Sequence, residues 1–587
     1  MQQPPLRILA LSALLLITAC APPVAAPNLP STPTRAPAPT GAASTVGTAA
    51  PTSQAAAQPP TGKTITIVIR SEPTDLFGLG PNGMTAAATD VKPIFHDPLV
   101  RRDDKGQLLP VLAAEVPSAE RGTWRVLPDG GMEMTWKLRP NVTWQDGAPL
   151  TSADVAFAFA VRKDSEAARA GNGPGRVEQI QSVETPDPLT AVVRWSSAYY
   201  DGAESSALEP LPQHLLEGLD GAALMSSPLM STEAIGAGPY KLVDWARGSS
   251  MTFTRYENHF RGRPQLDQVV VRFIGDPIAQ IAAITDGTAD VVIPAGVDAA
   301  SITDIRTRWQ GTGNEAFLGL TGRLNVLEVQ LRPETSRPRN GFTNLQVRQG
   351  FYHALDRQTL AETQTNKIAP PADSWIRPDS TLRRELDTSI PQYPFDIFHG
   401  GRLIEFGGWT RDAEGTLANA QTGEPFAFEV WGRPGTDQLA TAVAESWTAT
   451  GARTSVTMIP PARANDGQYE AQRPGMLLSQ VPDRLIWERH LHSRQVATPA
   501  NNWTGANRSG FSKPGVDDLV ERLTGTIDPG GQMAFQRQLL YDVLGELPIM
   551  PLYWDVVPAL VRKGVKALIV PGASTTANIY EWDKDPG

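Results

Sequence analysis

A glycine-rich segment near the start of the folded part could bind phosphate. Residues 78–83 (GLGPNG) match the G-x-G-x-x-G pattern of dinucleotide-binding loops. Such a loop must follow a strand directly and open a helix, but residues 71–77 separate it from the nearest predicted strand. Pro81 and Asn82 favour a turn. We therefore interpret the segment as a flexible loop, and we expect no cofactor.

Two histidines with an acidic neighbour could hold a metal ion. His490 and His492 lie one residue apart, and Glu488 lies beside them. Alternate residues share a face only on a strand and diverge on a helix, and a third well-placed ligand is not visible in the sequence. The only cysteine is Cys20, which excludes a site built from several thiolates. We expect the histidines on a solvated face and predict no metal site.

A tryptophan and an arginine at the end of a predicted strand could contact a ligand. Trp431 ends the strand 427–431, and Arg433 lies in the loop 432–435 that follows. Loops at the carboxyl ends of strands commonly face ligand crevices in α/β sheets, and arginine can bind a carboxylate through two parallel hydrogen bonds. The alternatives are a tryptophan packed in the core and an arginine at the surface. Trp431 and Arg433 are the first two predicted ligand-binding residues.

No motif of an enzyme is visible. The sequence contains no serine nucleophile elbow, no pair of catalytic carboxylates and no phosphate loop. Catalytic residues need not be contiguous, so this absence is weak evidence. It nevertheless favours a binding protein over an enzyme.

The elements that would position these residues alternate between strands and helices. Runs with alternating or β-branched apolar residues predict strands at 64–70, 132–139, 190–195, 240–245, 251–256, 268–274, 290–293, 427–431, 548–553 and 565–570. Capping residues before periodic apolar positions predict helices that begin after Thr151, Asp276 and Asn344, and another at 437–448. Strands and helices mixed on this scale predict an α/β or α+β protein with several lobes.

Length and composition agree with a multi-lobed globular protein. At about 150 residues per domain, 587 residues correspond to three or four lobes. Hydrophobic residues make up 41% of the chain and charged residues 19%, which is ordinary for a protein that buries a core. The formal charge is −10, whereas nucleic acids and anionic membranes require a basic face. We therefore expect no nucleic-acid partner.

The first sixty residues predict a secretion signal and a tether. Arg7 precedes ten mostly apolar residues, 8–17, which is about half of what a membrane helix needs. The Ile-Thr-Ala sequence before Cys20 resembles the bacterial lipobox, which implies cleavage before Cys20 and acylation of its sulfur. Pro, Ala, Ser, Thr and Gly then dominate, so this segment cannot bury a core. We predict a signal peptide at 1–19 and an acylated, disordered tether at 20–60.

Five blocks in chain order resemble the family 5 extracytoplasmic solute-binding proteins of peptide ABC transporters. The second block contains the run MTWKLRPNVTWQDGAPLTSADVAFAF, the third contains GAGPYKLVDW, and the last contains ELPIMPLYW. The blocks lie at residues 99–112, 134–159, 236–290, 344–360 and 511–560. Together they extend over nearly the whole body, from about residue 62 to 570.

The resemblance implies an α/β fold that forms a two-lobed periplasmic-binding-protein-like type II clamp with an extra inserted subdomain. Lobe I would comprise residues 61–98, 232–330 and 541–587, and the inserted subdomain would comprise 99–231. Lobe II would comprise 331–540. In such clamps the ligand lies between lobes that close by a hinge motion.

The resemblance also implies further ligand-binding residues. Glu72 falls in the loop that faces the cleft in the family, and Asn502 and Trp503 lie in a loop that could line it. Peptide-binding members resemble a Gly-Trp-x-x-Asp-x-x-Asp-Pro pattern whose acidic residue holds the α-ammonium of the peptide. Here the matching segment contains Gln480 but lacks Gly-Trp and the first Asp, whereas Asp483 resembles the second Asp with the order of Pro and Asp inverted. This departure leaves peptide, sugar, opine and metal-chelate ligands open.

These observations together predict a lipid-anchored receptor on the outer side of a cell membrane. We expect a monomer that binds a peptide or another small polar solute and delivers it to the permease subunits of an ABC importer. The alternatives are an accessory lipoprotein that senses a ligand without transport, and a surface-tethered hydrolase. An adhesin is a weaker alternative, since the sequence is not repetitive.

Overall fold

We describe the protein from a computed structural model. The described residues are 62–79, 84–103, 107–165, 174–219, 221–293, 299–378, 380–386, 390–464, 466–483, 486–568 and 574–585. The chain divides into two compact units, Met1–Pro59 and Pro60–Gly587, and the described residues belong to the second, which we call the body. The predicted signal peptide (1–19), Cys20, the tether (20–60) and positions 80–83 of the glycine motif lie outside these residues. None of the described helices has the length and apolarity needed to cross a membrane.

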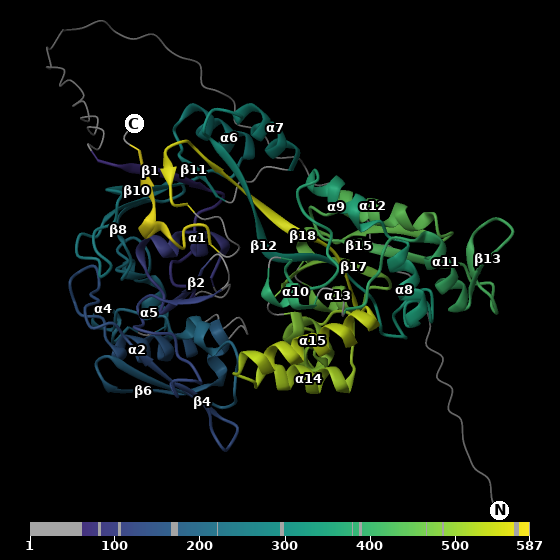
Figure 1. Cartoon of the computed structure of the whole chain (residues 1–587), viewed down its shortest axis with the longest axis horizontal. Coiled ribbons are helices and arrows are strands. Elements are labelled where there is room, and N and C mark those ends of the chain that lie inside the picture. Colours follow the sequence, from purple (N-terminus) through teal and green to yellow (C-terminus); the bar gives the residue numbers. More distant parts are fainter. Residues whose placement is uncertain are drawn as a thin grey trace, which may run out of the picture. The chain divides into compact units, whose positions relative to one another are not determined.

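A ten-stranded mixed sheet joins segments that are far apart in the sequence (Figure 1). Its strand order is β16-β15-β17-β12-β18-β11-β1-β10-β9-β8. In that order the strands are Arg453–Met458, Ala427–Gly432, Met476–Pro482, Glu315–Glu328, Ile549–Val561, Val291–Val292, Thr64–Ile69, Gln268–Phe273, Ser250–Arg255 and Tyr240–Ala246. The strands predicted at 64–70, 240–245, 251–256, 268–274 and 427–431 are confirmed within a residue or two.

Two long strands, β12 and β18, connect the two ends of this sheet. They pair antiparallel from Glu315 opposite Val561 to Glu328 opposite Ile549, and the pairing shifts register between Leu320 and Leu324. Gly322 lies in this interruption with φ +70°, a conformation that glycine adopts without strain. A bulge of this kind bends a strand and increases its twist. The interruption therefore lies where the sheet passes from one core to the next.

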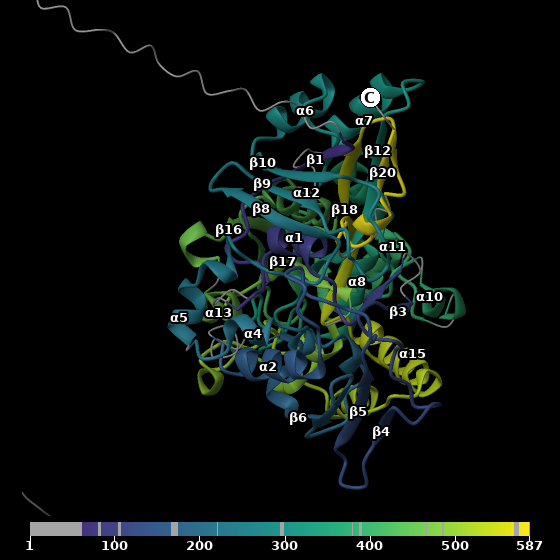
Figure 2. The same cartoon turned by 90° about the vertical axis from the view of Figure 1, so that its left-hand side faces the viewer.

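One end of the sheet carries the first core. Apolar residues of β1, β9 and β10 pack with helix α1 (Ala86–Phe95), and Ala559 and Val561 of β18 join them. Figure 2 shows β8, β9 and β10 lying side by side, as their antiparallel pairing requires. Helix α6 (Pro277–Asp286) begins where predicted, because the carboxylate of Asp276 accepts a hydrogen bond from the backbone N–H of Ala279 at 2.7 Å. This core defines the first lobe.

A separate four-stranded sheet forms the inserted subdomain. Its order is β4-β5-β7-β6, with the strands Trp124–Val126, Met132–Lys137, Thr190–Trp195 and Ile180–Asp187. Helix α2 (Ser152–Lys163) packs on it, and the carboxylate of Asp154 accepts a hydrogen bond from the backbone N–H of Thr151 at 2.7 Å, as its capping sequence predicts. Trp136, Trp144 and Trp195 are fully buried in this core.

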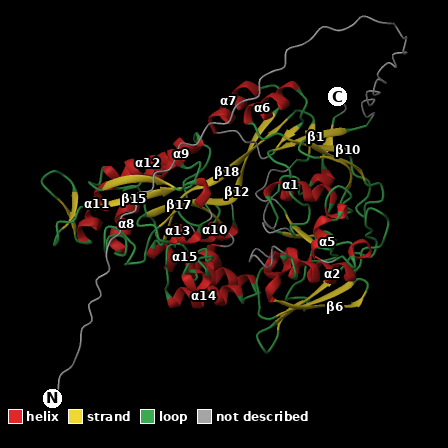
Figure 3. Ribbon diagram, turned by 180° about the vertical axis from the view of Figure 1, so that it is seen from behind, coloured by secondary structure: helices red, strands yellow, loops and turns green. Residues whose placement is uncertain are grey.

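The other end of the sheet belongs to the second lobe. Helices α8 (Leu345–His353) and α12 (Asp437–Thr448) pack against β15 and β16, and Phe351 and Trp447 are central to that core. Figure 3 shows these helices beside the strands of this end. Helices α14 (Pro514–Thr524) and α15 (Pro529–Glu546) pack in a neighbouring apolar cluster with Trp487 and Trp554. The protein is thus an α/β protein of two lobes that share one sheet and carry an inserted subdomain.

The strand predicted at 565–570 includes only Val565–Lys566 (β19) among the described residues 565–568, and the long strands β12 and β18 also differ from their prediction. Strand β12 was not predicted, because Gly319, Gly322 and Asn325 interrupt any alternation of apolar residues. Strand β18 was predicted to end at residue 553 but continues to Val561, although Asp555 and Pro558 break its apolar run. Both strands are stabilised by pairing with each other along most of their length, a nonlocal contact that the local pattern does not report.

Candidate functional site

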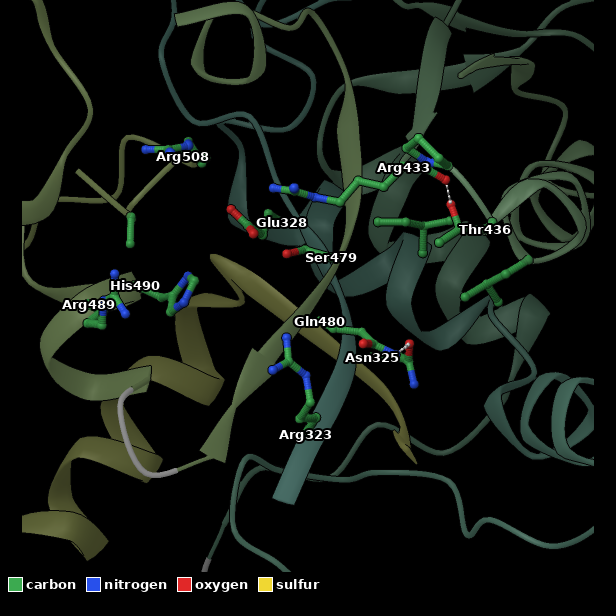
Figure 4. Close-up of a pocket in the computed structure, with 15 residues that line it drawn as sticks. Arg323, Asn325, Glu328, Arg433, Thr436, Ser479, Gln480, Arg489, His490 and Arg508 are labelled. Carbon is green, nitrogen blue, oxygen red and sulfur yellow. Dashed lines mark hydrogen bonds between the residues drawn. The ribbon is translucent and has the colours of Figure 1, made fainter. Parts of the chain in front are cut away.

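A pocket of about 510 Å³ lies in the second lobe, where β12 and β17 run antiparallel (Figure 4). Asn325 and Glu328 come from β12, Ser479 and Gln480 come from β17, and Arg433 follows β15. Because β15 and β17 are parallel, their carboxyl ends meet at the same edge of the sheet. This is the position where loops commonly face ligands in α/β proteins.

The pocket is rich in basic side chains. Its charged and titratable lining residues are Arg323, Glu328, Arg433, Arg489, His490 and Arg508. With the imidazole neutral, four arginines against one glutamate give the lining a charge of +3. The whole chain carries −10, so this surplus is local and opposite in sign to the net charge.

Arg433 lies in the pocket wall, as the position of its loop predicts. Its guanidinium contacts the carboxylate of Glu470 at 2.7 Å and donates a hydrogen bond to the carbonyl of Ala464 at 3.0 Å. The Nε atom of Arg433 is buried and has no partner among the described residues. Arg508 approaches the same carboxylate at 3.3 Å. Two arginines therefore share one buried acid, and Figure 4 shows Arg433 pointing toward Glu328 and Arg508.

Buried charged side chains next to this wall of the pocket stabilise it. Arg473 is fully buried and donates hydrogen bonds to the carbonyls of Glu470, Glu328 and Arg508 at 2.7–3.1 Å. Burial lowers the pKa of Arg473 to about 10, and the nearby glutamates oppose the change only in part. Burial also raises the pKa of Glu470 above its ordinary value, although Arg433 and Arg508 favour its charged form. The arginines remain charged at neutral pH.

The segment Ile486–Leu491 forms a π-helical turn that carries Arg489 and His490 into the pocket lining. The Nδ1 atom of His490 is buried without a partner among the described residues. Burial lowers the pKa of His490, and Arg489, Arg508 and Arg433 lower it further, whereas Glu328 opposes them. The imidazole is therefore neutral at pH 7.

The expectation that His490 and His492 share a solvated face is wrong for His492. His492 is only 4% exposed, and its Nδ1 accepts a hydrogen bond from the backbone N–H of Arg494 at 3.1 Å. The π-helical turn buries this side chain next to helix α14, a geometry that the short sequence does not predict. Among the residues that the structure describes, no group of three His, Cys, Asp or Glu side chains could hold a metal ion.

Two predicted residues lie on β17 or directly after it. Gln480 is exposed, lines the pocket and donates a hydrogen bond to Asn325 Oδ1 at 3.2 Å. Asp483 follows the strand and lies beside Gly322 in the interruption of β12. The structure thus places Gln480 in the pocket and Asp483 near its edge.

Three other predicted residues do not line the pocket. Trp431 is 7% exposed, its Nε1 donates to Glu429 Oε2 at 2.8 Å, and its ring packs against Tyr469. Asn502 and Trp503 have left-handed backbone conformations in the loop before Arg508, and the carbonyl of Trp503 accepts a hydrogen bond from the Arg508 guanidinium at 3.3 Å. Trp503 therefore contributes to the site by positioning Arg508.

Glu72 lies in the first lobe. Its carboxylate accepts hydrogen bonds from the indole N–H of Trp245 at 2.7 Å and from the backbone N–H of Gly248 at 3.0 Å. Arg247 contacts it at 3.5 Å. These partners belong to β8 or to the turn between β8 and β9. Glu72 remains a predicted ligand contact, held in place by its own lobe.

Sequence reasoning missed four charged residues of the pocket: Arg323, Glu328, Arg489 and Arg508. Arg323 and Glu328 lie on the unpredicted strand β12, so no local pattern marked them. Arg489 lies on a π-helical turn, and Arg508 lies in an irregular loop. The one available signal was the concentration of arginines in segments that also contain predicted ligand residues.

The sequence and the fold can be compared with those of known proteins. The chain is 25% identical over 319 residues to a Brucella ovis protein named for peptide binding in an ABC transporter, and the match spans 54% of this chain and about half, 55%, of that protein. It is 23% identical over 494 residues to the oligopeptide-binding protein AppA of Bacillus subtilis, covering 80% of this chain and 82% of AppA.

Solved structures share the fold. AppA in complex with a nonapeptide aligns with a TM-score of 0.65 and 19% identity, covering 89% of this chain and all of AppA. NikZ from Campylobacter jejuni in complex with Ni(L-His) aligns with a TM-score of 0.67 and 20% identity, covering 89% of this chain and 99% of NikZ. The family described as "Bacterial extracellular solute-binding proteins, family 5 Middle" matches residues 109–487, well over half of the chain. The chain therefore belongs to the family 5 bacterial extracellular solute-binding proteins, as the order of its sequence blocks predicts.

Proposed function

We propose that this protein is the receptor of an ABC importer and binds a peptide or a peptide-sized solute in the pocket between β12, β17 and the loop after β15. The observation that carries the proposal is the position of the pocket, which is lined by β12, one of the two strands that connect the lobes. Relatives named for peptide binding support the peptide class. The structure of NikZ with Ni(L-His) keeps a metal chelate as the second class to test.

Transport would require the two lobes to move. This proposal keeps the two lobes expected from the sequence but moves their boundary from residue 330 to the register shift between Leu320 and Leu324 of β12, because Leu324 and Leu327 pack in cores of the second lobe. A ligand that contacts both lobes would favour their closure, because a ligand shifts conformations only by its differential affinity for them. The closed receptor would then deliver its solute to the permease subunits.

The N-terminal segment would hold the receptor at the membrane. The lipobox-like sequence before Cys20 and the composition of residues 20–60 support this part of the proposal through sequence alone. Each buried methylene of an attached lipid contributes about 0.8 kcal/mol, and stable anchoring takes more than one acyl chain. We expect the full chain in the membrane fraction of its bacterium, and release of a Cys20→Ser variant would test the anchor.

Binding can be tested with the body, Pro60–Gly587. Native mass spectra of the purified body should show a discrete added mass, and the released molecule should fragment as a peptide. Small-angle scattering should show a smaller radius of gyration with solute than without it. If no mass is added, and neither peptides, oligosaccharides nor metal chelates raise the melting temperature, the receptor function is contradicted.

A further inference from the structure

We infer that the solute is held through a carboxylate by the arginines of the pocket, rather than through an ammonium group by an acid. This inference rests on the proposed receptor function and specifies its ligand. It follows from three features of the pocket: which arginines have unused donors, where the acids lie, and how the local charge is distributed.

The arginines have more hydrogen-bond donors than their protein partners use. Arg489 is exposed, and within the described part of the chain it forms no ion pair. Arg433 and Arg508 share the single carboxylate of Glu470, and Arg433 Nε has no described partner. A guanidinium presents five N–H donors in a planar fork that matches a carboxylate. The pocket can therefore accept an additional anionic group.

An ammonium group would meet one acid against four arginines. Among the described lining residues that acid is Glu328, which is 2% exposed and toward which Arg433 points (Figure 4). Glu470 is also buried and is already shared by two arginines. A cation that approached Glu328 would also meet Arg433 and Arg508 in the same wall. The positive charges of these arginines would repel the cation, so the pocket disfavours the cationic end of a ligand.

Strand β17 adds no charge to the lining of the pocket. Residues 476–484 read MLLSQVPDR, so Gln480 takes a position in the pocket without contributing a charge. The uncharged lining contributed by β17 and the surplus of arginines point to the same ligand class: a peptide anchored by its carboxyl end, or another carboxylate-bearing solute.

The inference can be tested with short peptides of alanine and glycine, whose only charges are at their ends. Three forms would be titrated into the wild-type body by calorimetry: the free peptide, the N-acetylated peptide and the C-terminal amide. We expect acetylation to change the affinity less than about threefold and amidation to weaken it at least about tenfold. Citrate, which has carboxylates but no ammonium, should bind detectably.

Two variants assign the effect to the pocket. Arg489→Gln should weaken the free peptide and citrate about tenfold and leave the peptide amide unchanged. Arg494→Gln is the matched control, because Arg494 lies five residues away, is 72% exposed and contacts Glu521 outside the pocket. Its affinities should equal those of the wild type. Melting temperatures of both variants would show that they remain folded.

The outcomes distinguish a failure of the carboxylate inference from a failure of the proposed receptor function. A peptide that binds as its amide but not after acetylation would overturn the carboxylate inference and leave the receptor function intact. Binding of citrate without any peptide would support the carboxylate inference and redirect the solute class. If neither citrate nor any peptide binds, the inference is overturned, and the native mass spectra still decide separately whether the body carries a solute.

Discussion

Two clusters of buried charges, one in each half of the body, differ in their balance. The balanced cluster is formed by residues of the first lobe and of the inserted subdomain, and it contains Lys92, Arg162, Asp75 and Glu209. The arginine-rich cluster lies around the pocket and contains Arg332, Arg433, Arg473, Arg508, Glu328 and Glu470. The first has two cations and two anions, whereas the second has four cations and two anions.

This difference in charge balance indicates which cluster has its charges paired without a ligand. Burial raises the pKa of Glu209, but Lys92 and Arg162 outweigh it, so its pKa lies below the ordinary value. The pKa of Glu470 is raised, although two arginines contact it. Buried charges are tolerated when they are paired. The balanced cluster therefore stabilises the fold by itself, and the arginine-rich cluster has capacity for an anion from outside.

The largest effect is expected from removing an acid of the balanced cluster. Glu209→Gln leaves Lys92 and Arg162 without their shared carboxylate, and it should lower the free energy of unfolding by about 3 kcal/mol. Glu470→Gln should lower it by less, about 1 kcal/mol, because the side chain of Arg433 is 34% exposed and water can solvate it, whereas that of Arg162 is 2% exposed. Urea unfolding of both variants measures the difference. Equal losses would contradict the comparison.

A buried histidine next to the balanced cluster should make stability depend on pH. Burial and the nearby Lys92 lower the pKa of His96 from 6.5 to about 4. Between pH 4 and 6.5 the unfolded chain binds a proton at His96 that the folded chain does not. The contribution of this residue to the free energy of unfolding is therefore fully present above pH 6.5 and is lost as the pH falls to 4. The loss from this residue is about 3 kcal/mol.

This pH dependence can be isolated with His96→Gln. The variant should lose less stability than the wild type between pH 6.5 and 4 in thermal or urea unfolding. His399→Gln is the control, since His399 is exposed on helix α11 (Ile397–Phe406), and it should follow the wild type. Parallel curves for His96→Gln and the wild type would show that His96 does not carry the effect.

An intermediate effect on ligand affinity is expected where the inserted subdomain meets the second lobe. Arg176 of the subdomain forms an ion pair with Glu488, which is buried in the same π-helical turn as Arg489 and His490. The backbone N–H of Tyr200 also donates to the carbonyl of Thr524 at 2.8 Å. Arg176→Gln should weaken solute binding about tenfold, because it removes a contact between the subdomain and the pocket segment.

Calorimetry with the identified solute measures this loss of affinity. Small-angle scattering without solute should show a larger radius of gyration for Arg176→Gln than for the wild type. Arg194→Gln is a suitable control, because Arg194 is half exposed on β7 of the inserted subdomain and its ion pairs within the described residues are with Glu133 and Glu184 of the same sheet. Unchanged affinity in Arg176→Gln would mean that the ion pair does not contribute to closure.

The smallest effect is expected from increasing the charge surplus of the pocket. Glu470→Gln removes one of the two acids of the arginine-rich cluster and frees donors of Arg433 and Arg508. Affinity for citrate should rise about threefold. Glu445→Gln, on the exposed face of α12, should leave it unchanged. Weaker binding of citrate by Glu470→Gln would show that Glu470 mainly orients the arginines.

Local sequence patterns predicted much of the first lobe and subdomain. Strand β1, the hairpin of β8 and β9, and the cap at Thr151 follow from alternation, turns and capping residues, which act within a few positions. Local sequence patterns did not predict β12, because its sequence is irregular and the strand is held by pairing with β17 on one side and β18 on the other. Because β12 contributes Arg323 and Glu328, part of the site was missed with it.

The sequence by itself determined the family, the order of the elements and the place of Arg433 after a strand. It also showed that the segment around Gln480 lacks Gly-Trp and the first Asp of the pattern expected for peptide-binding members, and that it contains Asp483. Only the tertiary structure decided that Arg433, Arg489 and Arg508 meet in one pocket while Trp431 is buried beside it. The reason is physical: a charge surplus is a sum over side chains that are distant in the chain, and only packing brings them together.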